Sequence, residues 1–222
     1  MDSLDAVVKS GKVLYLGISD TPAWIVSAAN TYARAHGKTQ FCIYQGRWSV
    51  MLRDLERDII PMVRHFGMAL APWDVIGGGR FQTKKAMDER KKAGESIRTL
   101  MGGPEQTEDE VKISEALSKV AAEHGIESVT AVALAYVMAK TPYVYPIVGG
   151  RKVEHLNDNI QALKLRLTPE QIEYLESQRP FDIGFPGNFV GEDPKMTGKT
   201  PMILAGTAQL SWVQSGKPFT AA

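Results

Sequence analysis

The clearest chemical signal in the sequence is a pair of glycines followed by two basic residues, between an apolar run and a helical segment. The apolar run at residues 143–147 is typical of a buried strand, and Gly149 and Gly150 turn the chain after it. Glycines let backbone N–H groups approach a ligand closely, and the N-terminus of the following helix adds partial positive charge. Arg151 and Lys152 oppose the helix dipole in its first turn, so a bound anion would relieve that conflict. The pattern indicates a phosphate site; a tight turn with solvated charges is the alternative.

Polar or aromatic residues also stand at the ends of three other apolar runs. Ser19 and Asp20 follow the run at residues 13–18. Gln45 ends the run that starts at residue 41, and Trp73 ends the run that starts at residue 68. The carboxyl ends of the strands carry the site in a parallel α/β fold, so these side chains are expected to share one site. The alternatives are a hydroxyl bonded within its own turn, an amide bonded to the next loop and an indole packed in the core.

Strand and helix patterns alternate along the chain. Continuous apolar runs suit strands buried on both faces of a parallel sheet, and four are expected, at residues 13–18, 41–45, 68–73 and 143–147. Helices are expected at residues 3–10, 21–35, 53–65, 84–92, 107–124, 128–140, 153–163 and 168–178. This order predicts an α/β fold, but four βα units do not close a barrel of eight strands. A small open sheet and one half of a larger fold are the two alternatives.

The chain is expected to be a single domain over residues 1–222, with βα units at 1–179 and a tail at 180–222 laid over the fold. A formal net charge of +1 argues against nucleic acid and anionic membranes as partners. The single cysteine, Cys42, excludes an internal disulfide and a cysteine-cluster metal site, and it is expected in the core. No histidine has metal-ligand spacing, so no metal site is expected. The absence of a secretory signal and of an apolar run of 18 residues favours a cytoplasmic protein.

Two segments of the sequence resemble signatures of the aldo-keto reductase family. Residues 11–19, Gly-Lys-Val-Leu-Tyr-Leu-Gly-Ile-Ser, resemble the signature at the fifth barrel strand, and residues 146–159 resemble the one at the eighth strand. Residues 43–45 and 71–73 fall where the sixth and seventh strands belong. Gly-Arg-Trp-Ser after Gln45 and Asp-Val-Ile-Gly-Gly-Gly after Trp73 are closest to the fungal aryl-alcohol dehydrogenase and norsolorinic acid reductase branch. The resemblance implies an incomplete (β/α)8 barrel that holds strands five to eight.

The resemblance assigns the nicotinamide end of an NADP(H) site to the first three strand ends. Ser19 would hold the carboxamide, with Asp20 standing where the family usually has Asn. Gln45 would bind the same amide, and Trp73 would stack on the nicotinamide ring where Tyr is typical.

The adenosine end is assigned to the segment after the fourth strand. Gly149 and Gly150 would form the turn, and the basic pair that follows would meet the 2′-phosphate and favour NADPH over NADH. His155, which replaces a common Gln, and Asn159 would flank the adenosine.

The family's catalytic Asp, Tyr, Lys and His come from strands two to four, so no catalytic residue is assigned here. The resemblance implies reduction of aldehydes or ketones with hydride transfer from NADPH, and it implies aryl or polyketide-type carbonyls as the substrate class. A half-barrel that binds nucleotide or a partner chain without catalysis is the alternative, and a fragment of a longer protein is a third reading.

Half of a barrel would leave two strand edges and one apolar sheet face without neighbours, which monomeric proteins avoid. Two coverings are therefore expected as alternatives. One is a homodimer formed through the exposed sheet edges. The other is a tail that folds back as a lid, with Phe181, Phe185, Phe189 and Trp212 as its apolar residues.

Overall fold

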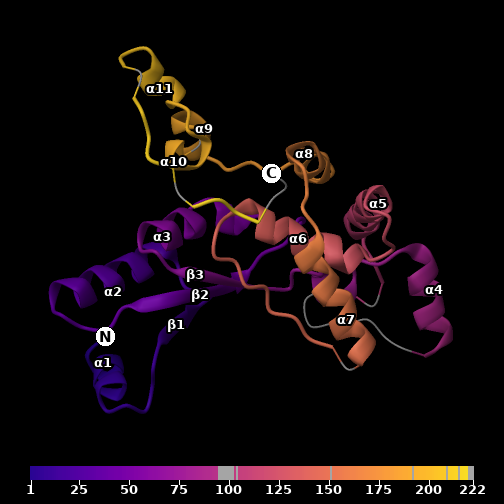
Figure 1. Cartoon of the computed structure of the whole chain (residues 1–222), viewed down its shortest axis with the longest axis horizontal. Helices are drawn as coiled ribbons and strands as arrows, with labels where there is room; N and C mark the ends of the chain where they lie inside the picture. Colours follow the sequence, from indigo (N-terminus) through magenta and orange to yellow (C-terminus); the bar gives the residue numbers. More distant parts are fainter. Residues whose placement is uncertain are drawn as a thin grey trace.

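Three parallel strands form the sheet of this α/β fold, in the order β1 (Leu16–Ser19), β2 (Phe41–Arg47) and β3 (Ala69–Trp73) (Figure 1). The computed structural model describes residues 1–94, 103, 105–150, 152–191, 193–208, 210–214 and 216–219. The α/β class and the parallel pairing confirm the interpretation of the alternating pattern.

The helices up to residue 177 follow the expected positions closely, whereas the short helices within residues 187–205 were not expected. They are α1 (Asp2–Lys9), α2 (Ala23–Ala35), η1 (Asp54–Glu56), α3 (Ile59–His65), η2 (Gly77–Gly79), α4 (Lys84–Lys92), α5 (Glu108–Glu123), α6 (Val129–Lys140), α7 (Val153–Gln161), η3 (Ala162–Lys164), α8 (Pro169–Ser177), α9 (Gly187–Val190), α10 (Pro194–Thr197) and α11 (Met202–Ala205).

Side chains cap three of these helices at the residues that the sequence indicates. Thr107 and Thr168 form capping boxes with Glu110 and Gln171, and Ser128 caps α6. These contacts span three residues, so local sequence is enough to predict them.

The segment at residues 143–147 lies beside β3 as expected, but it is not a regular strand. The backbone N–H of Leu70 donates to Tyr143 at 3.0 Å, the N–H of Tyr145 donates back to Leu70 at 2.8 Å, and the N–H of Ile147 donates to Pro72 at 2.8 Å. The prediction of a regular fourth strand is wrong because Tyr143 has a φ of 59° and because Pro72 on β3 has no N–H to donate to this segment. Only a single parallel bridge, Leu70 to Val144, is formed.

The sheet is buried on one face and open on the other. Leu16, Tyr44 and Leu70 belong to one apolar core with α6, in which residues 129–139 are all buried. On the opposite face Gly17, Ser19, Gln45 and Tyr145 are exposed, and Cys42, which is skipped in the pairing of β1 with β2, is exposed as well. The expectation of strands buried on both faces, and of Cys42 in the core, is therefore wrong.

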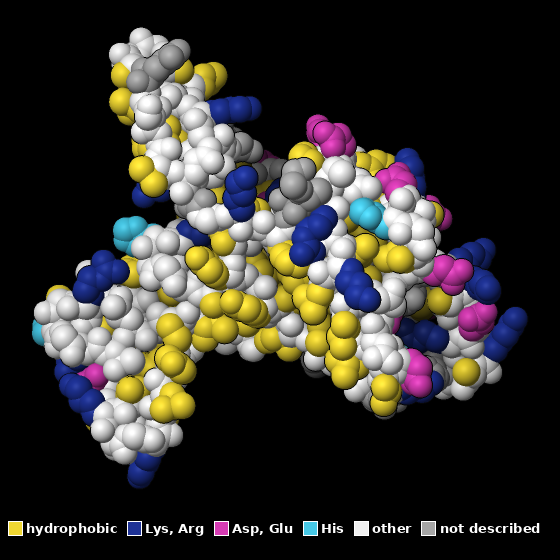
Figure 2. All heavy atoms as spheres, viewed as in Figure 1, with side chains coloured by type: hydrophobic (Ala, Val, Ile, Leu, Met, Phe, Trp, Pro, Cys, Tyr) yellow, Lys and Arg dark blue, Asp and Glu magenta, His cyan; other side chains and the backbone are white. Residues whose placement is uncertain are grey.

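The strand prediction also fails at the start of β1. The strand begins at Leu16, and the two residues before it are exposed, with Leu14 at 79%. Figure 2 shows hydrophobic side chains gathered in a band across this face of the molecule, between the region of the sheet and α7.

The tail does not form the expected lid. Helices α9 to α11 project away from the sheet beyond α3 (Figure 1). Phe185 is 82% exposed, and Phe189 is exposed as well. Phe181 instead lies beneath the guanidinium groups of Arg53 and Arg57, and the N–H of Phe219 donates to Met138 on α6 at 3.0 Å.

A partly buried network of four charges joins η1, α6 and α8. Arg53 lies 2.8 Å from Glu56 and 3.0 Å from Glu176, and Lys140 pairs with both carboxylates. The hydroxyl of Tyr136 donates to Glu176 at 3.0 Å.

Burial raises the pKa of Tyr136 well above its usual value, and the charges of Glu56 and Glu176 add to that rise. Burial alone would raise the pKa of Glu56 too. The hydrogen bond from Arg53 and the charge of Lys140 outweigh that effect and hold the pKa of Glu56 below its ordinary value.

Replacing Glu176 with alanine is expected to lower the free energy of unfolding by about 2–4 kcal/mol, because it leaves Glu56 as the one carboxylate between two cations and removes the acceptor of a buried hydroxyl. Urea unfolding followed by circular dichroism measures the loss. Glu173→Ala, on the exposed face of the same helix, is the matched control and should change stability by no more than about 0.5 kcal/mol. Equal effects of the two variants would contradict a stabilising network.

Asp5 on α1 stabilises the fold to an extent that depends on pH. Its carboxylate pairs with Lys9 at 2.7 Å and accepts the N–H of Thr39 at 2.9 Å, and these contacts lower its pKa to about 2. The pKa of this carboxyl in the unfolded chain is about 3.9, which is higher than in the folded protein. The ionised carboxylate therefore stabilises the fold above about pH 3.9, and this stabilisation is lost as the pH falls toward 2. Asp5→Asn should therefore flatten the fall in stability between about pH 5 and pH 2. Unfolding curves across that range test this, and an unchanged slope would refute it.

Candidate functional site

The predicted residues at the first three strand ends lie together in the structure. Parallel pairing places Ser19 opposite Gln45, and their side chains meet with the hydroxyl 3.3 Å from Oε1. The hydroxyl of Ser19 also donates to Oδ2 of Asp20 at 2.6 Å. The indole Nε1–H of Trp73 donates to Oδ1 of Asp20 at 3.1 Å. The expectation that these strand ends carry neighbouring side chains is confirmed.

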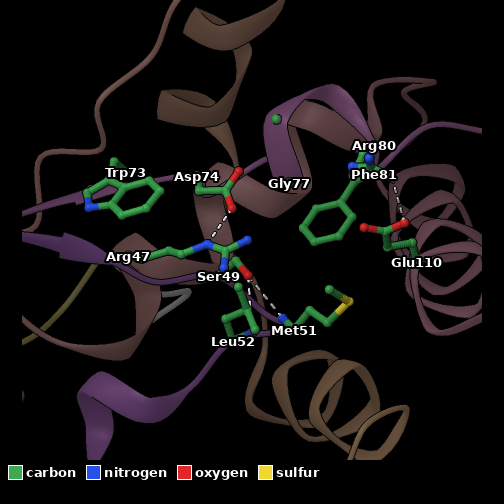
Figure 3. A pocket seen from close by; sticks show the side chains of 11 residues that line it. Arg47, Ser49, Met51, Leu52, Trp73, Asp74, Gly77, Arg80, Phe81 and Glu110 are labelled. Atoms are coloured by element: carbon green, nitrogen blue, oxygen red, sulfur yellow. Dashed lines mark hydrogen bonds and ion pairs between the residues drawn. The ribbon is translucent and has the colours of Figure 1, made fainter. Parts of the chain in front are cut away.

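Two further residues belong to this group and were missed in the sequence. Arg47 lies directly opposite Trp73 across β2 and β3, and its Nε–H donates to Asp74 at 2.7 Å. Its guanidinium carbon is 5.6 Å from the centroid of the Trp73 ring system. Figure 3 shows the guanidinium group next to the carboxylate of Asp74, with Trp73 to one side of the pair. The sequence could have indicated Arg47, because the alternation of side chains along a strand places residue 47 on the same face as Gln45.

We call Ser19, Asp20, Gln45, Arg47, Trp73 and Asp74 the strand-end cluster. Both aspartates directly follow a strand and have left-handed backbones, with φ of 48° at Asp20 and 60° at Asp74. Aspartate adopts this conformation more readily than most residues. The chain thus turns sharply at each strand end.

A small cavity of about 90 Å³ adjoins the cluster on the side of Arg47 and Asp74 (Figure 3). Ser49, Gly77 and Phe81 line it with them. Gly77 has a φ of 58°, and a Cβ there would lie 3.0 Å from the Phe81 ring. Residues 77–79 form the 3-10 turn η2. A cavity of this volume holds a few waters or one small polar group, but not a dinucleotide.

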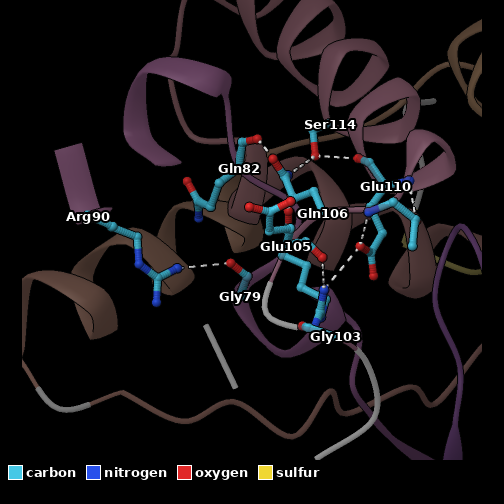
Figure 4. A network of polar contacts seen from close by, with 10 residues as sticks. Gly79, Gln82, Arg90, Gly103, Glu105, Gln106, Glu110 and Ser114 are labelled. Carbon is cyan, nitrogen blue, oxygen red and sulfur yellow. Dashed lines mark hydrogen bonds and ion pairs between the residues drawn. The ribbon is translucent and has the colours of Figure 1, made fainter. Parts of the chain in front are cut away.

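A buried ion pair behind this turn ties it to α5. The guanidinium of Arg80 lies 3.2 Å from Glu110 and donates to the carbonyl of Glu105 at 2.8 Å. Gln106 bridges the carbonyl of Gln82 at 3.2 Å and the hydroxyl of Ser114 at 3.4 Å (Figure 4). These contacts hold residues 79–82 against α5 and so fix one wall of the cavity.

The second predicted group follows the segment beside β3. Because Ile147 bonds to Pro72, the Gly149–Gly150 turn starts at the same edge of the sheet as Trp73. Gly150 approaches the following helix closely, since a Cβ there would lie 2.8 Å from Cβ of His155.

The remaining members of this group lie on or next to α7. Lys152 precedes the first turn and is exposed, as is His155, while Asn159 is half-buried. Arg151 lies outside the described residues. The assignment of these residues to an adenosine site stays a prediction.

The described part of the chain offers neither a metal-ion site nor a helix that could span a membrane. Among those residues no group of three or more His, Cys, Asp or Glu side chains could hold a metal ion. None of the described helices is both long and apolar enough to cross a membrane.

Comparison with known proteins finds relatives that are named aryl-alcohol dehydrogenase or aldo-keto reductase. A Saccharomyces cerevisiae protein named "Probable aryl-alcohol dehydrogenase AAD4" is 68% identical over 96% of this chain and 64% of its own length. Aldo-keto reductase ausK of Aspergillus calidoustus is 58% identical over 98% of this chain and 54% of its own length. Aryl-alcohol dehydrogenase [NADP(+)] of Phanerodontia chrysosporium is 54% identical over 86% of this chain and 50% of its own length.

The chain therefore spans about half to two thirds of the length of these curated relatives. The model of the aldo/keto reductase family matches residues 1–179, which include the strand-end cluster and both segments that resemble the family signatures. This chain belongs to the aldo/keto reductase family.

Proposed function

We propose that the chain contributes the NADP(H)-binding part of an oxidoreductase that interconverts aryl carbonyl compounds and alcohols. The observation that carries this proposal is the strand-end cluster, in which a hydroxyl, an amide and an indole meet at one open edge of a parallel sheet. The names of the relatives support it, because two of them are aryl-alcohol dehydrogenases and one name specifies NADP(+). When bound, the cofactor supplies the hydride.

The residues present fit the nicotinamide end of such a cofactor. Ser19 and Gln45 are exposed on the open face, where a carboxamide can both donate to and accept from them. Trp73 is partly exposed beside them and offers a flat aromatic surface on which a planar ring can stack. These side chains bind and orient; none of them is assigned as the proton donor.

The Gly149–Gly150 turn and the start of α7 fit the phosphate end. The turn leaves the same edge of the sheet as Trp73, so one extended ligand could reach both places. Arg151 and Lys152 would then meet the 2′-phosphate, with His155 and Asn159 beside the adenosine. An incomplete (β/α)8 barrel that holds strands five to eight is part of this proposal.

The open sheet face favours a second candidate function, which is pairing with another chain. Tyr145 is 61% exposed, and among the described residues β1 has a neighbouring strand only on its β2 side. A second copy that covers this face would form a homodimer, and a nucleotide-binding half without catalysis is compatible with it.

The chain is expected to bind NADPH at least tenfold more tightly than NADH, because charge-assisted contacts to phosphate contribute about 1.5–3 kcal/mol each. Isothermal titration of both cofactors measures the ratio. Arg151→Ala and Lys152→Ala should each reduce it, whereas Lys164→Ala, an exposed lysine on η3, should leave it unchanged. Equal affinities for the two cofactors in the native chain would contradict the phosphate assignment.

The 222 residues by themselves are expected to reduce aromatic aldehydes at no more than trace rates. A positioned proton donor typically contributes about 10²–10⁴-fold, and no residue here is assigned that role. Oxidation of NADPH followed at 340 nm with a benzaldehyde series tests this. Turnover that stays with the chain through repeated purification would show that a residue of this segment acts as the acid.

A further inference from the structure

The indole of Trp73 is held from two sides by charged residues. Its Nε1–H donates to Oδ1 of Asp20 at 3.1 Å. The guanidinium of Arg47 lies over the ring system, 5.6 Å from its centroid. Asp74 holds Arg47 in turn, at 2.7 Å from Nε. The orientation of the ring is thus defined by contacts at its edge and at one of its faces.

Both carboxylate oxygens and the backbone N–H of Asp20 are engaged by protein groups. Oδ1 accepts from Trp73, Oδ2 accepts from the hydroxyl of Ser19 at 2.6 Å, and the backbone N–H donates to the carbonyl of Gln45 at 2.9 Å. An ionised carboxylate has no proton to donate, so it cannot offer a carboxamide both a donor and an acceptor. The carboxylate of Asp20 is therefore better suited to holding the indole and its neighbouring side chains than to binding a carboxamide.

Arg47 limits where a ligand can stack. Cations favour the electron-rich face of an indole, and the face that Arg47 covers is closed to a planar ring. The opposite face of Trp73 is the one left for stacking. Rotation of the indole about its side-chain bonds would break the hydrogen bond to Asp20 and remove the ring from Arg47 at the same time.

We propose that Asp20 is a positioning residue that fixes the plane of Trp73, with Arg47 and Asp74 completing the brace, so that the free indole face is presented to the nicotinamide. The identity of the stacked ring rests on the proposed function. The brace itself rests only on the contacts within the strand-end cluster. Asp20 then acts on cofactor binding through Trp73, not by touching the carboxamide.

Two substitutions separate the carboxylate from the backbone at this position. Asp20→Gly removes the acceptor and suits the left-handed φ of 48°. Asp20→Asn keeps an acceptor oxygen and also tolerates that conformation. In ¹⁵N-labelled chain, the indole N–H resonance of Trp73 is assigned by its loss in Trp73→Phe. Asp20→Gly is expected to shift this resonance and speed its exchange with water, and Asp20→Asn is expected to keep it slow. An unchanged resonance in Asp20→Gly would overturn the brace, whether or not the chain binds a cofactor.

NADPH titrations test the functional part. Asp20→Gly should weaken binding about threefold to tenfold, the equivalent of one hydrogen bond, and Asp20→Asn should restore most of the loss. In the Trp73→Phe background, Asp20→Gly should have almost no further effect, because the donor it serves is gone. The same weakening in both backgrounds would show that Asp20 acts on the cofactor directly or through Ser19, and would overturn its role in positioning Trp73. If the native chain does not bind NADPH, the proposed function fails, while the indole resonance still decides whether the brace exists.

Discussion

The parallel register of β1, β2 and β3 is the constraint on which the candidate site depends. It places Ser19 beside Gln45 and Arg47 beside Trp73, so that residues far apart in sequence end at one edge of the sheet. Parallel strands all finish at the same edge, and the chain must turn there before each returning helix. The turns expose polar side chains and backbone groups at that edge. A shift of the register by one residue would carry Gln45 and Arg47 to the buried face, where neither polar group would find its present partners.

The same sheet is supported unequally on its two faces, and this asymmetry shapes the rest of the molecule. Helix α6 is apolar around its whole circumference, and residues 129–139 are buried between the sheet, α5 and α7. A helix of this kind is stable only when surrounded. The opposite face of the sheet has no comparable cover among the described residues, which leaves Tyr145 in contact with solvent.

The strand-end cluster suggests how departures from the usual residues of the family can compensate one another. Aspartate in place of asparagine weakens the interpretation of residue 20 as a carboxamide ligand. The structure pairs that aspartate with the indole of Trp73, a donor that a tyrosine hydroxyl would not place at the same point. Arg47 and Asp74 form a second pair at the same ring. Each change is better understood with its spatial neighbour than by comparison with the usual residue at its own position.

Local sequence was sufficient for the features whose partners lie within one turn of the chain. The capping boxes at Thr107 and Thr168, the cap at Ser128 and the bounds of α4 follow from residues three or four positions apart, so their geometry is decided wherever the helix forms. The strand ends at Ser19, Gln45 and Trp73 were predicted because apolar runs mark the strands and parallel strands share an edge. The resemblance to the family then gave these residues their roles.

Only the tertiary structure decided which faces are buried and which charges meet. The sequence of β1 and β2 is apolar up to the polar residues at the strand ends, so it does not distinguish a strand covered on both faces from one covered on a single face. Asp20 and Trp73 are 53 residues apart, and Arg80 and Glu110 are 30 apart. The network of Arg53, Glu56, Lys140 and Glu176 joins three helical segments. No local pattern selects such partners, because a charged side chain in sequence is compatible with solvent or with any opposite charge, and the packing of the backbone alone brings one of them within hydrogen-bonding distance.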